Sequence, residues 1–121
     1  MNLLRHFPRF RRAYRELANL EARERWSRPE IETFQLARLN RLWRHAVRHV
    51  PYYRTLRTAS RLPERFSSLQ EFRSTVPMLP KQRVSLRSDE FLSEIPDRGR
   101  WFRTGGSTGT PTSAIGARRH T

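Results

Sequence analysis

Residues Arg103–Thr112 read RTGGSTGTPT and mark the point where a helical pattern gives way to a strand-forming one. The chain has five glycines, and none lies before residue 99, so the glycines of this stretch are a local feature. Glycine allows backbone conformations that other residues resist, and successive N–H groups can then point into one concavity and bind an anion. Hydroxyl side chains add donors around the same rim. The pattern predicts a loop that holds a phosphate chain and consists of Thr104, Gly105, Gly106, Ser107, Thr108, Gly109, Thr110 and Pro111.

Two familiar phosphate loops do not fit this stretch. A Walker A loop needs a lysine directly after its last glycine, whereas Gly109 is followed by Thr110 and Pro111. The dinucleotide fingerprint needs a glycine two residues before Gly106, and that position is Thr104. An ordinary glycine-rich hairpin tip is the remaining alternative, although such a tip needs one or two glycines and no run of hydroxyls.

Residues 99–121 are expected to form a strand, the phosphate loop and a second strand. Gly99 ends the helical pattern, and residues 101–104 read as the first strand-like stretch. Thr112, Ala114 and Ile115 then fit the start of a second strand. We therefore predict the start of a β-hairpin that carries the loop.

Residues 26–98 are expected to be helical, with prolines at the joints. The run SRPE places Ser27 at an N-cap with Glu30 three residues later, which is the pattern of a capping box. The helix that follows is predicted to end at Pro51, whose ring forbids its continuation. One wide apolar stripe is expected along this helix, made of Ile31, Phe34, Leu36, Leu39, Leu42, Trp43, Ala46 and Val50.

Shorter elements follow in the same region. Residues 51–56, which read PYYRTL, look like a packed corner, and Ser67 or Ser68 is expected to cap a short helix that points Leu69 and Phe72 inward. Residues 76–81, which read VPMLPK, predict an extended connector, and Pro80 opens another helix through Leu86. Phe91, Leu92 and Ile95 add a further apolar patch.

Residues 1–25 form a basic segment of their own. Apolar residues recur at three- and four-residue steps from Leu3 to Leu20, which predicts a helix that Pro8 starts or kinks. A basic amphipathic helix can lie on an acidic membrane. Docking on the rest of the same protein is the alternative, and it is the commoner arrangement.

Composition limits the classes of function. The formal charge is +14, and the basic residues are 24 arginines and the single Lys81. The arginines are spread along the whole chain, whereas a nucleic-acid-binding domain usually clusters its basic residues on one face. A small Arg-rich nucleic-acid-binding or interaction protein is therefore kept only as the alternative. No cysteine is present, which excludes disulfides and thiolate chemistry. No apolar run is long enough to span a bilayer, and a cytoplasmic location is expected. His45 and His49 have a metal-ligand spacing, but no third ligand completes a site, so we interpret them as ordinary imidazoles.

The loop closely resembles the phosphate loop of adenylate-forming (AMP-binding) enzymes, whose pattern is Ser/Thr, Ser/Gly, Gly, Ser/Thr, Thr, Gly, any residue, Pro. Within that superfamily the upstream sequence is similar to the phenylacetate–CoA ligase group, which includes coenzyme F390 synthetase and CapK-like relatives. The matching landmarks are residues 34–39 (FQLARL), 45–54 (HAVRHVPYYR), 68–72 (SLQEF) and 76–81 (VPMLPK). The resemblance extends from about Trp26 to Pro111. Thr112 stands where many members have Lys, as it does in several CapK-like relatives.

The resemblance implies that the chain is the mainly α N-terminal segment of an α/β adenylate-forming enzyme. Such ligases use ATP and Mg²⁺ to convert a carboxylic acid into an acyl-adenylate, and the CoA ligases then transfer the acyl group to a thiol. In this family Thr104, Ser107 and Thr108 would offer hydroxyls to the phosphates, and the glycines would offer close backbone approach. The acyl pocket, the adenine-binding strands and the catalytic lysine of the family follow the loop and are not in this chain. We therefore expect an N-terminal fragment that is inactive alone, without catalytic residues or a metal site of its own. A truncated or frameshifted gene, a split reading frame, a pseudogene product and a subunit completed by a second chain are the alternatives for its origin.

Overall fold

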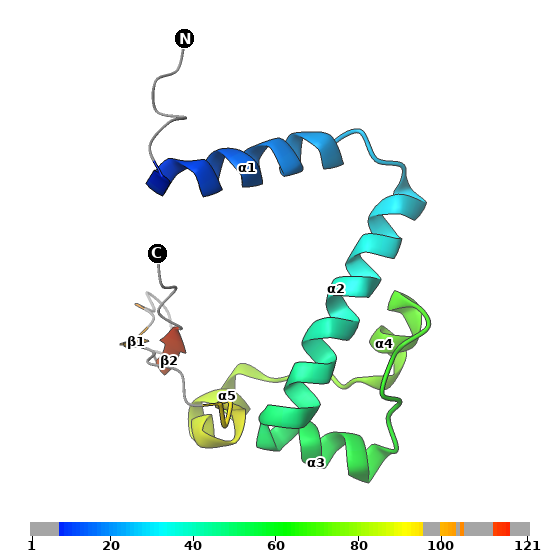
Figure 1. Ribbon diagram of the computed structural model, residues 1–121. Coiled ribbons are helices and arrows are strands. Elements are labelled where there is room, and N and C mark those ends of the chain that lie inside the picture. The colour runs from blue at the N-terminus through cyan, green and yellow to red at the C-terminus, as the bar shows by residue number, and fades with distance from the viewer. Residues whose placement is uncertain (1–7, 96–99, 104, 106–112, 117–121) are drawn as a thin grey trace. The chain divides into compact units, whose positions relative to one another are not determined.

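The computed structural model describes residues 8–95, 100–103, 105 and 113–116, and these fall into two compact units. One unit contains the residues up to Gln35, and the other runs from Leu36 to His120. The element order is five α-helices, a 3₁₀ turn and two strands (Figure 1). The predicted helical character of the region before the loop is therefore confirmed. Among the residues described, no helix has the length and apolar character needed to cross a membrane.

The first unit contains helix α1 (Pro8–Arg23) and the first turns of helix α2 (Arg28–His49). The predicted capping box is present, because the Ser27 backbone N–H and the Ser27 hydroxyl both donate to Glu30 Oε2, each at 2.7 Å. These hydrogen bonds to Ser27 lower the pKa of the Glu30 carboxyl. The ring of Phe34 is flanked by Trp26, at 5.3 Å between ring centroids, and by the guanidinium of Arg23, at 4.5 Å. These contacts fix the turn between α1 and α2.

Helix α2 ends at His49, as Pro51 predicts, but the chain does not turn into an irregular corner there. Val50 is extended (φ −116°, ψ 115°), and helix α3 (Pro51–Ser60) begins at once with Pro51 in its first turn. Helix α3 was not predicted from the sequence. It ends at Arg61, which has left-handed backbone angles (φ 50°, ψ 41°) and donates its N–H to the last turn of the helix.

Helix α4 (Leu69–Thr75) begins at Ser68, whose hydroxyl accepts a hydrogen bond from the Glu71 N–H at 3.0 Å. Ser67 contributes as well, because its N–H and hydroxyl both donate to Glu71 Oε2 and lower the pKa of that carboxyl. An extended connector leads to helix α5 (Lys81–Leu86), which follows Pro80 as predicted. The 3₁₀ turn η2 (Ser88–Phe91) comes next and packs on α3 and α5.

The core of the second unit lies between α2, α3 and the segment that leads into α4 (Figure 1). Trp43 and Phe66 are its centre, with rings 5.2 Å apart, and Leu62 is buried beside them. Tyr53 and Phe72 close the cluster with edge-to-face contacts to Trp43 and Phe66 respectively. The other partly buried members are Leu36, Val47, Leu56 and Val76.

A polar side chain, Asn40, joins this core and was not predicted. It is 4% exposed, and its amide bonds both backbone groups of Phe66: Nδ2 donates to Phe66 O at 2.9 Å, and Oδ1 accepts from Phe66 N at 2.8 Å. The Trp43 indole N–H donates to Pro63 O at 2.9 Å. Side chains of α2 thus supply the hydrogen bonds that the non-helical segment between α3 and α4 cannot make within itself.

The predicted apolar stripe of α2 is buried along one edge only. Leu36, Trp43 and Val47 face the core, whereas Leu42 is 65% exposed and Ile31 is 37% exposed. The core face of the helix follows the spacing 36, 40, 43, 47 and 50, which includes Asn40. The stripe is therefore wider than the buried face of the helix, because eight apolar residues cover a wider arc than one neighbouring layer buries.

Candidate phosphate-binding loop

The loop is held between two paired strands. Strand β1 (Arg100–Arg103) pairs antiparallel with strand β2 (Ser113–Gly116), so that Trp101 lies opposite Ile115 and Arg103 lies opposite Ser113. The loop of residues 104–112 is longer than the roughly 2–5 residues that usual hairpin turns need. Nine residues therefore separate the two strands.

Gly105 is the one predicted site residue that the structure describes. It is exposed, and a Cβ added to it would have no atom of the described residues within 4 Å. A phosphate oxygen could approach this backbone without displacing any described side chain. The other predicted site residues lie outside the described residues, namely Thr104, Gly106, Ser107, Thr108, Gly109, Thr110 and Pro111.

The residues that precede the strands are tied to the end of α2. The Glu94 N–H donates to His49 O at 2.7 Å, and the Glu94 carboxylate forms an ion pair with Arg54. Arg54 also donates to the backbone carbonyl of Arg48 at 2.7 Å. The hydrogen bond from Arg54 lowers the pKa of Glu94. This network ties Glu94 to the junction between α2 and α3.

Aromatic residues complete the same corner. The ring of Tyr52 packs at a tilt against Phe91 of η2, with ring centroids 4.6 Å apart, and makes an edge-to-face contact with Tyr53 at 5.0 Å. The guanidinium of Arg83 lies 5.6 Å from the centre of the Tyr52 ring. Burial raises the pKa of Tyr53, and its neighbour Tyr52 raises it further. The packed corner predicted at residues 51–56 therefore exists, although helix α3 forms it.

The two histidines of α2 lie close together but do not form a metal centre within the described part of the chain. The ring centroids of His45 and His49 are 5.0 Å apart. In the ranges 8–95, 100–103, 105 and 113–116, no three His, Cys, Asp or Glu side chains gather in a way that could hold an ion. Coulombic attraction from His49 contributes to the lowered pKa of Glu94, so this histidine belongs to the Arg54–Glu94 network.

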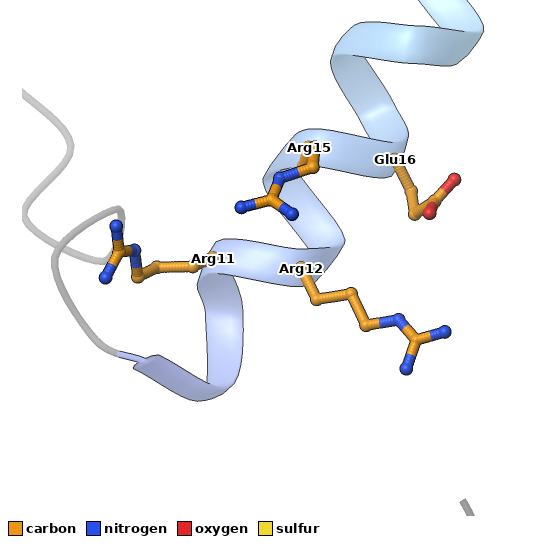
Figure 2. A pocket seen from close by; sticks show the side chains of 4 residues that line it. All are labelled: Arg11, Arg12, Arg15 and Glu16. Atoms are coloured by element: carbon orange, nitrogen blue, oxygen red, sulfur yellow. The ribbon is translucent and has the colours of Figure 1, made fainter.

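Helix α1 carries a second surface feature, which the sequence did not single out as a site. Arg11, Arg12, Arg15 and Glu16 line an open hollow on one helix, and their charged groups extend outward from the ribbon (Figure 2). All four side chains are exposed. A hollow formed by successive turns of a single helix does not enclose a small ligand. It is a basic surface.

In comparisons with known proteins, no protein-family model, no curated protein and no solved structure matches this chain.

Proposed function

We propose that the chain provides the helical N-terminal region and the phosphate loop of an ATP-dependent ligase that activates carboxylic acids as acyl-adenylates, with CoA as the acyl acceptor. The observation that carries the proposal is the sequence TGGSTGTP at residues 104–111, placed between strands that pair in register. The open space beside Gly105 is compatible with a bound phosphate group. The upstream landmarks support the same assignment, because they occur in the same order as in the phenylacetate–CoA ligase group.

The loop residues would act by positioning and by electrostatic stabilisation. ATP and Mg²⁺, when bound, supply an electrophilic phosphorus and share the charge of the leaving pyrophosphate. Thr104, Ser107, Thr108 and Thr110 would donate hydroxyl hydrogen bonds to the β- and γ-phosphates, and the backbone N–H groups around Gly105 would add further donors. Donors that are fixed before the reaction stabilise developing charge without reorganising. The loop sequence contains no carboxylate, so the phosphates rather than the loop would hold the magnesium ion.

In the family that the loop resembles, other segments select the carboxylic acid, bind adenine and bind CoA. We propose that residues 1–121 contribute phosphate binding, and that formation of acyl-adenylate requires those other segments as well. Trapping of acyl-adenylate with hydroxylamine tests this part directly, because any ATP-dependent product from residues 1–121 alone would contradict it.

Phosphate binding is tested on the full chain with inorganic pyrophosphate and with ATP–Mg²⁺, followed through the backbone amide NMR signals. We expect both to shift the amides of residues 104–111. Thr108→Ala is expected to weaken binding about tenfold, since a hydrogen bond to a charged group contributes about 1.5–3 kcal/mol. Thr33→Ala is the matched control, because Thr33 is an exposed threonine on α2.

Two results would count against the proposal. One is an absence of loop shifts at saturating pyrophosphate, and the other is equal weakening by Thr33→Ala. The alternative, a nucleic-acid-binding protein, predicts that an oligonucleotide binds without shifting the loop amides and that its binding falls steeply with salt. The same titration with an oligonucleotide at two salt concentrations therefore separates the two functions.

A further inference from the structure

Helix α1 has two faces of different chemistry. Helical spacing places Leu17 and Leu20 on one side of the helix and Arg11, Arg12 and Arg15 on the other. The two leucines are 49% and 54% exposed. The three arginines are exposed, and their guanidinium groups extend away from the helix (Figure 2). The structure therefore leaves apolar side chains and basic side chains of α1 open to solvent together.

The charges of α1 oppose the stability of an isolated helix. Its sequence contains five arginines and two glutamates, and its first turn contains no acidic residue. The N-terminus of a helix carries partial positive charge, so arginines near Pro8 are unfavourable there and an external anion is favourable. Helices in proteins gain most of their stability from packing of an apolar face, and Leu17 and Leu20 of α1 are about half exposed. An anionic partner would relieve the charge repulsion and stabilise the helix.

We propose that α1 binds the surface of an anionic lipid bilayer and lies in the plane of the interface. Leu17 and Leu20 would enter the boundary between headgroups and acyl chains, and the arginines would contact lipid phosphates. This one partner uses both faces of the helix at the same time. A nucleic acid would use the arginines and leave the leucines in water, so the observations favour a lipid surface. The inference does not depend on the phosphate loop.

The test is flotation of the full chain with phosphatidylcholine vesicles, with and without an equal part of phosphatidylglycerol, together with circular dichroism. We expect binding only to the anionic vesicles, with a gain of helix. Arg11→Gln/Arg12→Gln/Arg15→Gln is expected to weaken binding by roughly a hundredfold, since each basic residue near an anionic surface contributes about fivefold. Leu17→Gln/Leu20→Gln is expected to weaken it about tenfold or more, because apolar burial is lost.

Matched controls separate α1 from general cationic attraction. Arg41→Gln/Arg44→Gln/Arg73→Gln removes the same charge from exposed positions on α2 and α4, and Leu42→Gln replaces an exposed leucine. Both controls should bind anionic vesicles nearly as well as the unmodified chain. The proposal is overturned if anionic vesicles do not bind, if the control with three arginines replaced loses as much affinity as the α1 variant, or if the double leucine variant binds normally. A nucleic acid would be the partner of α1 instead if two results are found together. An RNA homopolymer would displace the unmodified chain from the vesicles, and the same RNA would bind the double leucine variant as tightly as the unmodified chain.

Discussion

Asn40 provides the strongest test of how the helical region is held together. The substitution Asn40→Ala removes both hydrogen bonds to the backbone of Phe66, a residue that is 1% exposed. The Phe66 N–H and C=O would then be buried without their partners. Each unpaired buried group costs about 1–3 kcal/mol, so we expect a loss of about 2–6 kcal/mol in the free energy of unfolding. Small domains have only about 5–15 kcal/mol in total, so this loss is a large part of the stability and the unfolding midpoint should fall strongly.

The helix itself cannot account for such a loss. Alanine favours a helix over asparagine by about 0.5 kcal/mol, so the change at Asn40 should strengthen α2 locally. Asn19→Ala makes the same chemical change at an exposed position of α1 and is the matched control. It should alter stability by no more than about 0.5 kcal/mol.

The assay is urea unfolding followed by circular dichroism, with amide hydrogen exchange as a local measurement. In the unmodified chain the Phe66 amide should exchange slowly, because its hydrogen is bonded to Asn40 Oδ1 inside the core. In Asn40→Ala this protection should fall, together with the urea midpoint. A variant as stable as the unmodified chain, with a protected Phe66 amide, would refute the view that this amide pair organises the segment between α3 and α4.

Two further predictions concern the C-cap residue Arg61 and the carboxyls of Glu71 and Glu94. Arg61→Gly should raise the free energy of unfolding by about 0.5–1 kcal/mol, because glycine adopts the left-handed angles of Arg61 without a side-chain clash. Arg61→Ala keeps a Cβ at this position and should give no such gain. Equal midpoints in thermal unfolding for the two variants would contradict this prediction. The pKa values of Glu71 and Glu94 lie below their ordinary value of 4.5, so the stabilisation they give is complete above about pH 4.5 and is lost as the pH falls through their lower folded values. As the pH is lowered below about 4.5, the urea midpoint should fall more in the unmodified chain than in Glu71→Gln/Glu94→Gln. An equal fall in both proteins would show that these carboxyls do not contribute to stability.

The ends of the helices could be predicted from the sequence because their signals are local. Ser27 with Glu30 and Ser68 with Glu71 satisfy N–H groups within a few residues of themselves, so the pattern and the structure contain the same interaction. Pro51 likewise ends α2 through its own ring. Each of these signals acts over one helical turn.

The arrangement of the core could not be predicted in the same way. Which edge of the α2 stripe is buried depends on where Phe66 and Leu62 return to it, and those residues come from a segment far along the chain. One signal was available for Asn40: it interrupts the spacing of Leu36, Trp43 and Val47 at a position that this spacing assigns to the core. A polar residue at such a position is expected to have buried partners. Helix α3 was missed because two tyrosines beside a proline resemble a turn, while burial of Tyr53 favours the helix.

The loop residues of the candidate site were proposed from the sequence, whereas the strands that flank them are seen in the structure. The residues of the loop were predicted from glycines and hydroxyls alone, and the structure adds the strand pairing on both sides of it. The upstream landmarks of the resemblance have structural tasks in the described residues: Val50 and Pro51 join two helices, Tyr53 and Phe72 close the core, and Arg54 forms an ion pair with Glu94. These tasks explain the landmarks without any contact to a nucleotide. The proposed chemistry therefore depends on the loop, and the upstream landmarks are explained by the packing of the helical region.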